Sequence, residues 1–86
     1  MPYTVYILYS NFLDKFYIGH TGDNLEQRIR RHLSDHSGFT SRAKDWKLVY
    51  SEIFPQKSDA SMRERELKGW KSSSRIRALI AQSKRG

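Results

Sequence analysis

The chain has 86 residues and a mass of 10.2 kDa, which suffices for one domain over residues 1–86 and excludes a second core. Lysine and arginine number 16 against 9 acidic residues, and the resulting formal charge of +7 points to a polyanionic partner such as nucleic acid. Hydrophobic residues make up 37% of the chain, which excludes a disordered basic tail. The lack of cysteine excludes disulfides, thiolate zinc sites and cysteine nucleophiles.

The first ten residues carry neither a signal peptide nor a membrane span. The run MPYTVYILYS has no cationic lead-in, and Tyr and Ser interrupt its apolar stretch. A membrane helix needs about 20 mostly apolar residues, more than this run supplies. Together with a composition that a reducing compartment permits, this leads us to expect a soluble, cytoplasmic protein.

Two strand-forming runs open the chain. Tyr3 to Tyr9 are β-branched, aromatic or leucine residues, and Phe16 to His20 repeats that character after a polar turn with Asn11 and Asp14. This pattern predicts a β-hairpin.

A helix is predicted next, over about residues 24–36. Asp23 followed three positions later by Glu26 is typical of a capping box, and Ser37-Gly38 ends the helical pattern. The apolar residues that recur at helical spacing between these limits are Leu25, Ile29 and Leu33.

The remainder of the chain predicts one strand and two helices. Trp46 to Phe54 is rich in strand formers and ends at Pro55, which cannot donate to a continuing ladder. Ser58 is the predicted cap of a second helix, and Ser72 to Ser74 offer caps for a third. The buried stripe of that third helix is predicted to be Ile76, Leu79 and Ile80. The order ββαβαα indicates an α+β fold, with a small three-stranded antiparallel sheet flanked by helices.

One acidic residue falls on a face of the second helix that should be buried. Ala60, Glu64 and Leu67 share a stripe at about 100° per residue. An acid in such a place must be paired, hydrogen-bonded or bound to a metal, because an unpaired buried charge is strongly unfavourable. The spacing leaves open a salt bridge to a basic residue, which is the commoner case, and a metal ligand.

The first helix places Arg28 and His32 at positions i and i+4, beside its apolar stripe. A guanidinium group is a planar fork that suits phosphate oxygens, so Arg28 is a candidate phosphate clamp. The alternative is a solvated or stem-packed surface arginine, an interpretation that fits Arg30 and Arg31 better.

The three histidines raise the alternative of a metal site. His32 and His36 are also spaced i and i+4, and His20 could add a third ligand from the hairpin. The signal is weak, because the chain has neither an HExxH pattern nor a cysteine. His32 is better interpreted as supporting a substrate or as hydrogen-bonding locally.

Four tyrosines crowd the predicted hairpin. Alternation places Tyr6 on the face opposite Tyr3 and Tyr9. A phenol near cations can act as a general base, although most strand tyrosines only pack and hydrogen-bond. Tyr17-Ile18-Gly19 ends the second strand with a residue that lacks Cβ and so permits close approach beside the Tyr17 phenol.

Taken together, these residues resemble the GIY-YIG nuclease family. Thr4-Val5-Tyr6 stands at the first motif, with Thr4 in place of glycine, and Tyr17-Ile18-Gly19 is the second motif intact. Arg28, His32 and Glu64 follow in the family's order. The chain is most similar to small single-domain bacterial members, through Gly38-Phe39-Thr40-Ser41-Arg42 before the third strand and Leu67-Lys68-Gly69-Trp70 after the acid.

The resemblance implies a role for each matched residue. It implies hydrolysis of nucleic-acid phosphodiesters with one divalent cation, Mg²⁺ or Mn²⁺, held by Glu64. By the same resemblance Tyr17 is the base that activates water, Arg28 stabilises the phosphate, and Tyr6 and His32 position groups or assist. His20 follows the second motif at a place where family members vary, and it receives no role.

The function predicted from the sequence is a metal-dependent endonuclease with little sequence specificity, acting on DNA, with RNA not excluded. Two alternatives stay open: a nucleic-acid-binding module of the same fold with little turnover, and a protein-interaction domain that uses exposed Trp70 or Phe54. The basic residues predicted to follow the nucleic-acid backbone are Arg63, Lys68, Lys71, Arg75 and Arg77.

Overall fold

The structure, a computed structural model, describes residues 2–34 and 42–83, apart from the side chains of His32 and Ser34. Within these limits the predicted order ββαβαα and the α+β class are confirmed. The elements are β1 (Tyr3–Ser10), β2 (Lys15–Thr21), α1 (Leu25–Ser34), β3 (Lys47–Phe54), α2 (Lys57–Gly69) and α3 (Ser73–Ser83).

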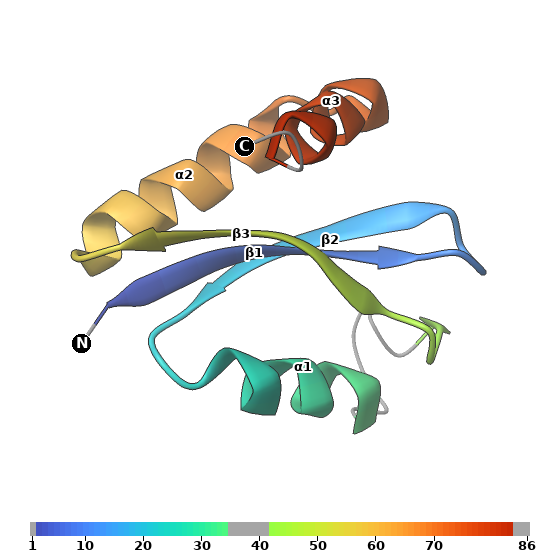
Figure 1. Cartoon of the computed structure of the whole chain (residues 1–86), viewed down its shortest axis with the longest axis horizontal. Coiled ribbons are helices and arrows are strands. Elements are labelled where there is room, and N and C mark those ends of the chain that lie inside the picture. Colours follow the sequence, from blue (N-terminus) through green and yellow to red (C-terminus); the bar gives the residue numbers. More distant parts are fainter. Residues whose placement is uncertain (1, 35–41, 84–86) are drawn as a thin grey trace.

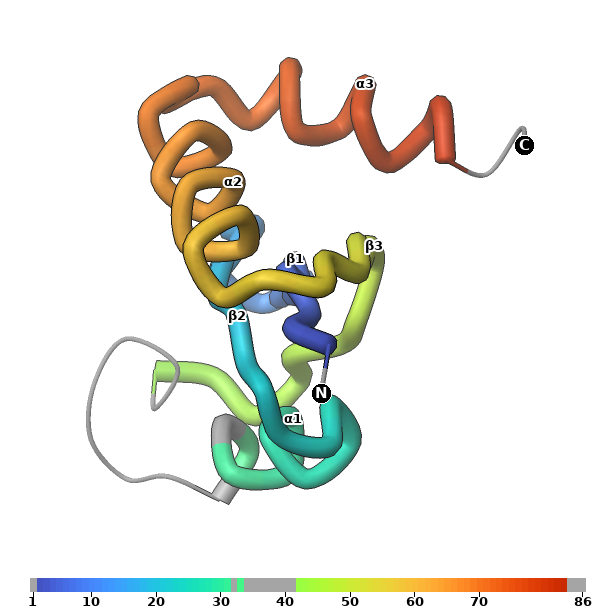
Figure 2. Tube along the Cα trace, turned by 90° about the vertical axis from the view of Figure 1, so that its left-hand side faces the viewer, coloured from blue at the N-terminus to red at the C-terminus, as the bar shows by residue number. Residues whose placement is uncertain are grey.

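The three strands form one antiparallel sheet in the order β2-β1-β3. The central strand β1 is the most apolar run of the chain, and Val5 to Leu8 are fully or almost fully buried there. Tyr6 pairs with Gly19 on β2 and with Ser51 on β3. Helices cover both faces of the sheet, with α2 and α3 on one side and α1 on the other (Figures 1 and 2). The arrangement leaves β2 as an edge strand below α2.

Alternation along the strands divides the core into two clusters. The cluster between the sheet and α2–α3 contains Val5, Ile7, Ile18, Ala60, Leu67, Ile76 and Ile80. The cluster on the α1 side contains Tyr6, Leu8, Ala43 and Trp46, with Tyr17, Leu25 and Ile29 packed against it. The predicted stripes of α2 and α3 are therefore confirmed, and Tyr6 does lie on the face opposite Tyr3, which packs against the other cluster.

Two predicted helix caps are wrong. The Asp23 N–H donates to the Thr21 hydroxyl, and it is Asn24 that caps α1, accepting from Gln27 N–H at 3.2 Å. The second helix begins before Ser58, because Ala60 N–H already bonds to the Gln56 carbonyl and Gln56 occupies the cap without a side-chain bond. At α3 the prediction is confirmed, since the Ser72 hydroxyl accepts from Arg75 N–H at 3.3 Å.

The aromatic residues considered for a protein-interaction surface belong to the core instead. Phe54 and Trp70 are half-buried and pack against the α2–α3 cluster. The guanidinium of Arg75 covers the Trp70 ring at 4.2 Å from its centroid. No helix in the described part of the chain is long and apolar enough to cross a membrane.

Candidate active site

Tyr6 and Tyr17 lie together on the α1 side of the sheet, with ring centroids 6.4 Å apart. Gly19 lies opposite Tyr6, and a Cβ atom at position 19 would stand 2.7 Å from the Tyr6 hydroxyl and 2.9 Å from Cζ. The glycine of the second motif is therefore needed so that the Tyr6 ring can cross the edge strand β2. This crossing fixes where the Tyr6 hydroxyl lies.

Arg28 reaches the same hydroxyl from α1. Its guanidinium donates a hydrogen bond to Tyr6, and this bond is the main reason that the pKa of Arg28 is raised, so Arg28 remains a cation. Burial raises the pKa of Tyr6 more than Arg28 lowers it, so the Tyr6 phenol stays protonated at neutral pH. The Nε atom of Arg28 is buried and has no hydrogen-bond partner among the described residues.

Glu64 approaches from α2, on the other side of the sheet. Its carboxylate accepts from Lys68 Nζ at 2.7 Å and lies 2.6 Å from Nδ1 of His20, while 20% of its side chain is exposed. Burial alone raises the pKa of Glu64, but the hydrogen bonds from Lys68 and His20 more than offset this, and the pKa falls below its usual value. An ionised carboxylate only accepts hydrogen bonds, so His20 Nδ1 is the donor.

The Tyr6 side chain connects these parts. Burial raises the pKa of Tyr6 most, the hydrogen bond from Arg28 lowers it, and the nearby Glu64 carboxylate adds a smaller rise. Arg28 comes from α1, Glu64 from α2 and the tyrosines from the sheet between them (Figure 1). The structure thus brings Tyr6, Tyr17 and Arg28 together on the α1 side of the sheet and places Glu64 beside His20 of β2 on the α2 side. One site shared by all four residues stays a prediction.

Comparison with known proteins identifies the family of the chain. A sequence model described as the GIY-YIG catalytic domain matches residues 2–77. The chain belongs to the GIY-YIG catalytic domain family. Among solved structures it is similar to the UPF0213 protein BH0048 from Bacillus halodurans, solved by solution NMR, with 29% identity and a TM-score of 0.59. That similarity covers 95% of this chain and 85% of the other, and no curated protein matches the chain.

Nucleases of the GIY-YIG family typically use a divalent metal, and the chemistry of Glu64 fits one. The described residues contain no group of three or more His, Asp or Glu side chains that could hold an ion. Mg²⁺ does not need such a group, because it binds through one or two carboxylates and keeps water and substrate phosphate as its other ligands. Glu64 is ionised and partly accessible, and its two oxygens offer more lone pairs than His20 and Lys68 occupy.

Several predicted residues lie outside what the structure describes. His32 belongs to α1, but its side chain is not described, and His36 and the Gly38-Phe39-Thr40-Ser41 segment lie outside the described residues. The three-histidine zinc hypothesis therefore stays untested in its main part. The side chain of the third histidine, His20, is described, and it hydrogen-bonds to Glu64.

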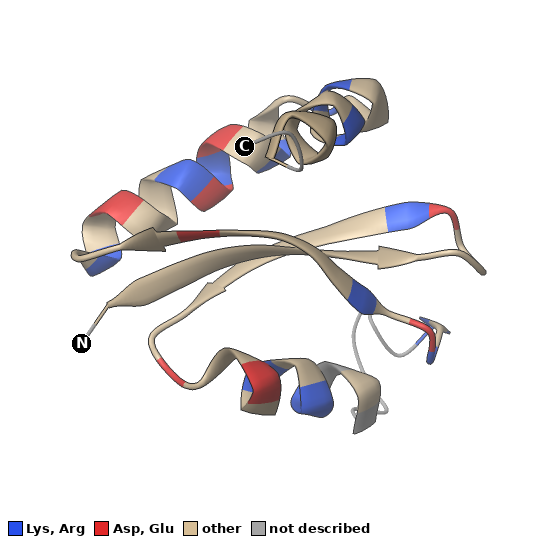
Figure 3. Cartoon of the chain, viewed as in Figure 1, with Lys and Arg blue, Asp and Glu red and all other residues tan. Residues whose placement is uncertain are grey.

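The basic residues predicted to contact the nucleic-acid backbone differ in whether they form ion pairs within the protein. Lys71 and Arg75 are exposed. Lys68 pairs with Glu64, and Arg77, half-exposed, pairs with Asp14 at 2.8 Å. All four lie at or beyond the C-terminal end of α2, where Figure 3 shows basic residues without acidic neighbours on α3.

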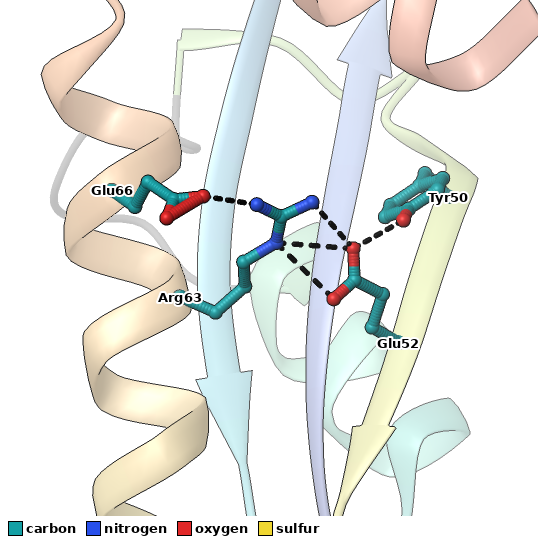
Figure 4. Close-up of polar contacts among 4 residues, drawn as sticks. All are labelled: Tyr50, Glu52, Arg63 and Glu66. Carbon is teal, nitrogen blue, oxygen red and sulfur yellow. Dashed lines mark hydrogen bonds and ion pairs between the residues drawn. The ribbon is translucent and has the colours of Figure 1, made fainter. Parts of the chain in front are cut away.

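Arg63 differs from these residues, because its charge is already neutralised inside the fold. Its guanidinium makes a bidentate contact with Glu52 of β3, at 2.9 to 3.2 Å, and also pairs with Glu66 (Figure 4). The Tyr50 hydroxyl donates to the same Glu52 carboxylate. This network ties α2 to β3, and we leave Arg63 out of the proposed nucleic-acid surface.

Two residues of the site were not recognised from the sequence. His20 and Lys68 both contact Glu64, the candidate metal ligand. For Lys68 the sequence had predicted only a contact with the nucleic-acid backbone. A signal for His20 was present, because Phe16, Ile18 and His20 alternate onto the sheet face that α2 covers. The i, i+4 spacing of Glu64 and Lys68 was a signal for the second pair.

Proposed function

We propose that this chain is a divalent-metal-dependent endonuclease that hydrolyses nucleic-acid phosphodiester bonds, with DNA as its substrate and little sequence specificity of its own. The observation that carries the proposal is Glu64, a carboxylate that stays ionised although it is mostly buried, and whose charge acts on a phenol bonded to Arg28. Membership of the GIY-YIG family supports nuclease chemistry in general.

Each side chain has a separate task in this proposal. Glu64 would hold Mg²⁺ or Mn²⁺, and a bound ion of this kind neutralises phosphate charge and stabilises the leaving oxygen. Tyr17, which is half-buried at the site, takes the proton from the attacking water. Arg28, which stays a cation, donates to a nonbridging phosphate oxygen. Tyr6 orients Arg28, and His32 assists by resemblance to the family.

The alternative is a nucleic-acid-binding module with little turnover. The pairing of Glu64 with Lys68 is the observation that favours it, since a carboxylate engaged in a salt bridge needs no metal to account for its burial. Salt-dependent binding without metal-dependent cleavage would support this alternative.

The deciding experiment incubates the purified chain with labelled single-stranded, duplex and branched DNA, with and without Mg²⁺ or Mn²⁺. We expect cleavage only with the metal, and a loss of about 100- to 1,000-fold in Glu64→Ala, because the variant lacks the ion and its charge stabilisation. Glu66→Ala is the matched control, an exposed acid on the same helix. Equal cleavage by Glu64→Ala and the parent would refute the proposal. His32→Ala should cost less than Glu64→Ala.

A further inference from the structure

An open groove of about 440 Å³ runs along β2 below the junction of α2 and α3. Most of its accessible lining is apolar, and its floor is formed by Phe16, Ile18, Leu67 and Ile76. The volume lies within the range of about 300–1,000 Å³ that small-molecule sites occupy. The groove is therefore large enough for one compact ligand.

The rim of the groove is basic. Lys15, Lys68 and Lys71 line it, and the acid at its edge, Asp14, is paired with Arg77 at 2.8 Å. The sequence from residue 67 to residue 86 contains no Asp or Glu at all. An apolar floor under a rim of lysines complements a ligand that combines a flat apolar part with a negative charge.

The groove is continuous with the candidate active site. Lys68 lines the groove and bonds to Glu64, so the groove adjoins the candidate metal ligand. Tyr17 also lines the groove, although its ring packs on the α1 side of the sheet. A ligand in the groove would therefore lie next to a phosphate bound at Glu64.

We propose that this groove binds one unstacked nucleotide next to the phosphate that is cut, so that the substrate is a strand with unpaired bases at the cleavage position. The inference rests on the proposed function for the position of that phosphate. In a duplex the faces of the bases are covered by stacking, and an apolar floor contacts only a base that has left the stack. The lysines of the rim then contact the phosphates on either side of that base.

The test measures binding without divalent metal, so that it does not depend on cleavage. The probes are two DNA duplexes of equal length that carry 2-aminopurine at the same position, one fully paired and one with two unpaired nucleotides there. Stacking of one base on a protein surface contributes about 1–3 kcal/mol, so we expect the parent to bind the unpaired probe about tenfold more tightly or better. Equal affinity for the two probes would overturn the proposal.

Two neighbouring serines supply a matched pair of variants. Ser73 lines the groove and Ser74 does not, and both are exposed in the first turn of α3. We expect Ser73→Trp to block the groove and abolish the preference for unpaired DNA, and Ser74→Trp to keep it. Loss of the preference in both variants, or in neither, contradicts the assignment.

A second pair of variants tests the basic rim and changes only exposed residues. The double variant Lys15→Gln/Lys71→Asn removes two rim charges, and asparagine tolerates the positive φ of 51° at position 71. Each lost single-strand phosphate contact lowers the salt slope by about 0.7, so the slope should fall by about 1.4. Lys47→Gln/Lys57→Gln removes the same charge outside the groove, and an equal fall there would contradict the proposal.

The two proposals fail in distinguishable ways. Preference for unpaired DNA without any metal-dependent cleavage refutes the endonuclease and leaves the groove assignment intact. Cleavage that depends on Glu64, by a chain that does not distinguish the two probes, refutes the groove assignment and leaves the endonuclease intact.

Discussion

Arg63 and Glu64 are consecutive residues of α2, and each makes a short ionic contact with a strand of the sheet. Arg63 contacts Glu52 on β3, and Tyr50 and Glu66 add further bonds to the same two side chains (Figure 4). Glu64 contacts His20 on β2, and its other partner is the exposed Lys68. We call the Arg63–Glu52 contact the closed side of α2, because four side chains bond to one another there. We call the Glu64–His20 contact the open side, because the Glu64 carboxylate keeps lone pairs for a further ligand.

The difference follows from helix geometry. Successive residues project about 100° apart, so a helix that lies along a sheet directs adjacent side chains to different strands. Arg63 meets the edge strand β3 and anchors the helix, whereas Glu64 meets the other edge strand, β2, which also carries Tyr17. Anchoring and chemistry are therefore expected to separate between two adjacent residues, and variants on either side test this.

The largest effect is expected on the open side, from His20→Ala. His20 acts as a positioning residue, because its Nδ1–H orients the carboxylate of Glu64. Loss of such a supporting bond typically lowers metal affinity or activity by about 10- to 100-fold. We expect a higher Mg²⁺ concentration for half-maximal cleavage with an unchanged melting temperature.

His20→Asn is the matched control for that measurement, because its side-chain amide stands where Nδ1 stood, can still donate to Glu64 and should restore part of the metal affinity. An unchanged Mg²⁺ requirement in His20→Ala would show that Glu64 needs no support from β2.

A smaller effect is expected from Gly19→Ala, which touches no charge. The added Cβ would lie 2.7 Å from the Tyr6 hydroxyl, so the phenol must move away from Arg28. Overpacking of this kind costs about 1 kcal/mol or more in free energy of unfolding. Denaturant titration and cleavage rates of Gly19→Ala, Tyr6→Phe and the double variant form a cycle. Strictly additive effects on cleavage would contradict the contact between the two positions.

The site could be predicted from the sequence only where its residues share one element with a clear pattern. Glu64 was found because Ala60 and Leu67 mark its helix face as buried, and Gly19 because it follows Tyr17 in a strand. His20 was not assigned, because its contact with Glu64 spans 44 positions and depends on where α2 lies over β2. Tertiary packing, which no local pattern encodes, decided that contact.

The fold was easier to predict than its boundaries. Apolar periodicity indicated every strand and helix that the structure describes. The caps at Asp23 and Ser58 were wrong because residue type favours several neighbouring positions equally, and the chain selects between them by backbone bonds. One of these bonds, from Ala60 to Gln56, starts α2 where Ala60 can reach the core.

On the closed side, Glu52→Gln should lower stability and spare the chemistry. Arg63 would keep Glu66 as a charged partner, whose side chain is 54% exposed. The half-buried guanidinium of Arg63 would lose its ionic partner on β3. Charged hydrogen bonds contribute about 1.5–3 kcal/mol, and solvent exposure reduces this, so we expect a loss of about 1 kcal/mol. Glu66→Gln, the exposed partner, should stay within about 0.5 kcal/mol in the same urea titration. A larger loss of stability in Glu66→Gln than in Glu52→Gln would reverse the assignment.

The smallest effect is the acid dependence of the open side. The pKa of Glu64 lies below its usual value of 4.5 in the fold, so between the two values the unfolded chain binds more protons than the folded chain. The stabilising contribution of Glu64 is therefore complete above about pH 4.5 and is lost as the pH falls through the lower, folded pKa. Glu64→Gln has no such group, so its free energy of unfolding should fall less than that of the parent on acidification. Parallel pH profiles for the two proteins would mean that Lys68 and His20 do not stabilise the charged carboxylate of Glu64. The electrostatic argument that separates Glu64 from the anchoring residue Arg63 would then be wrong.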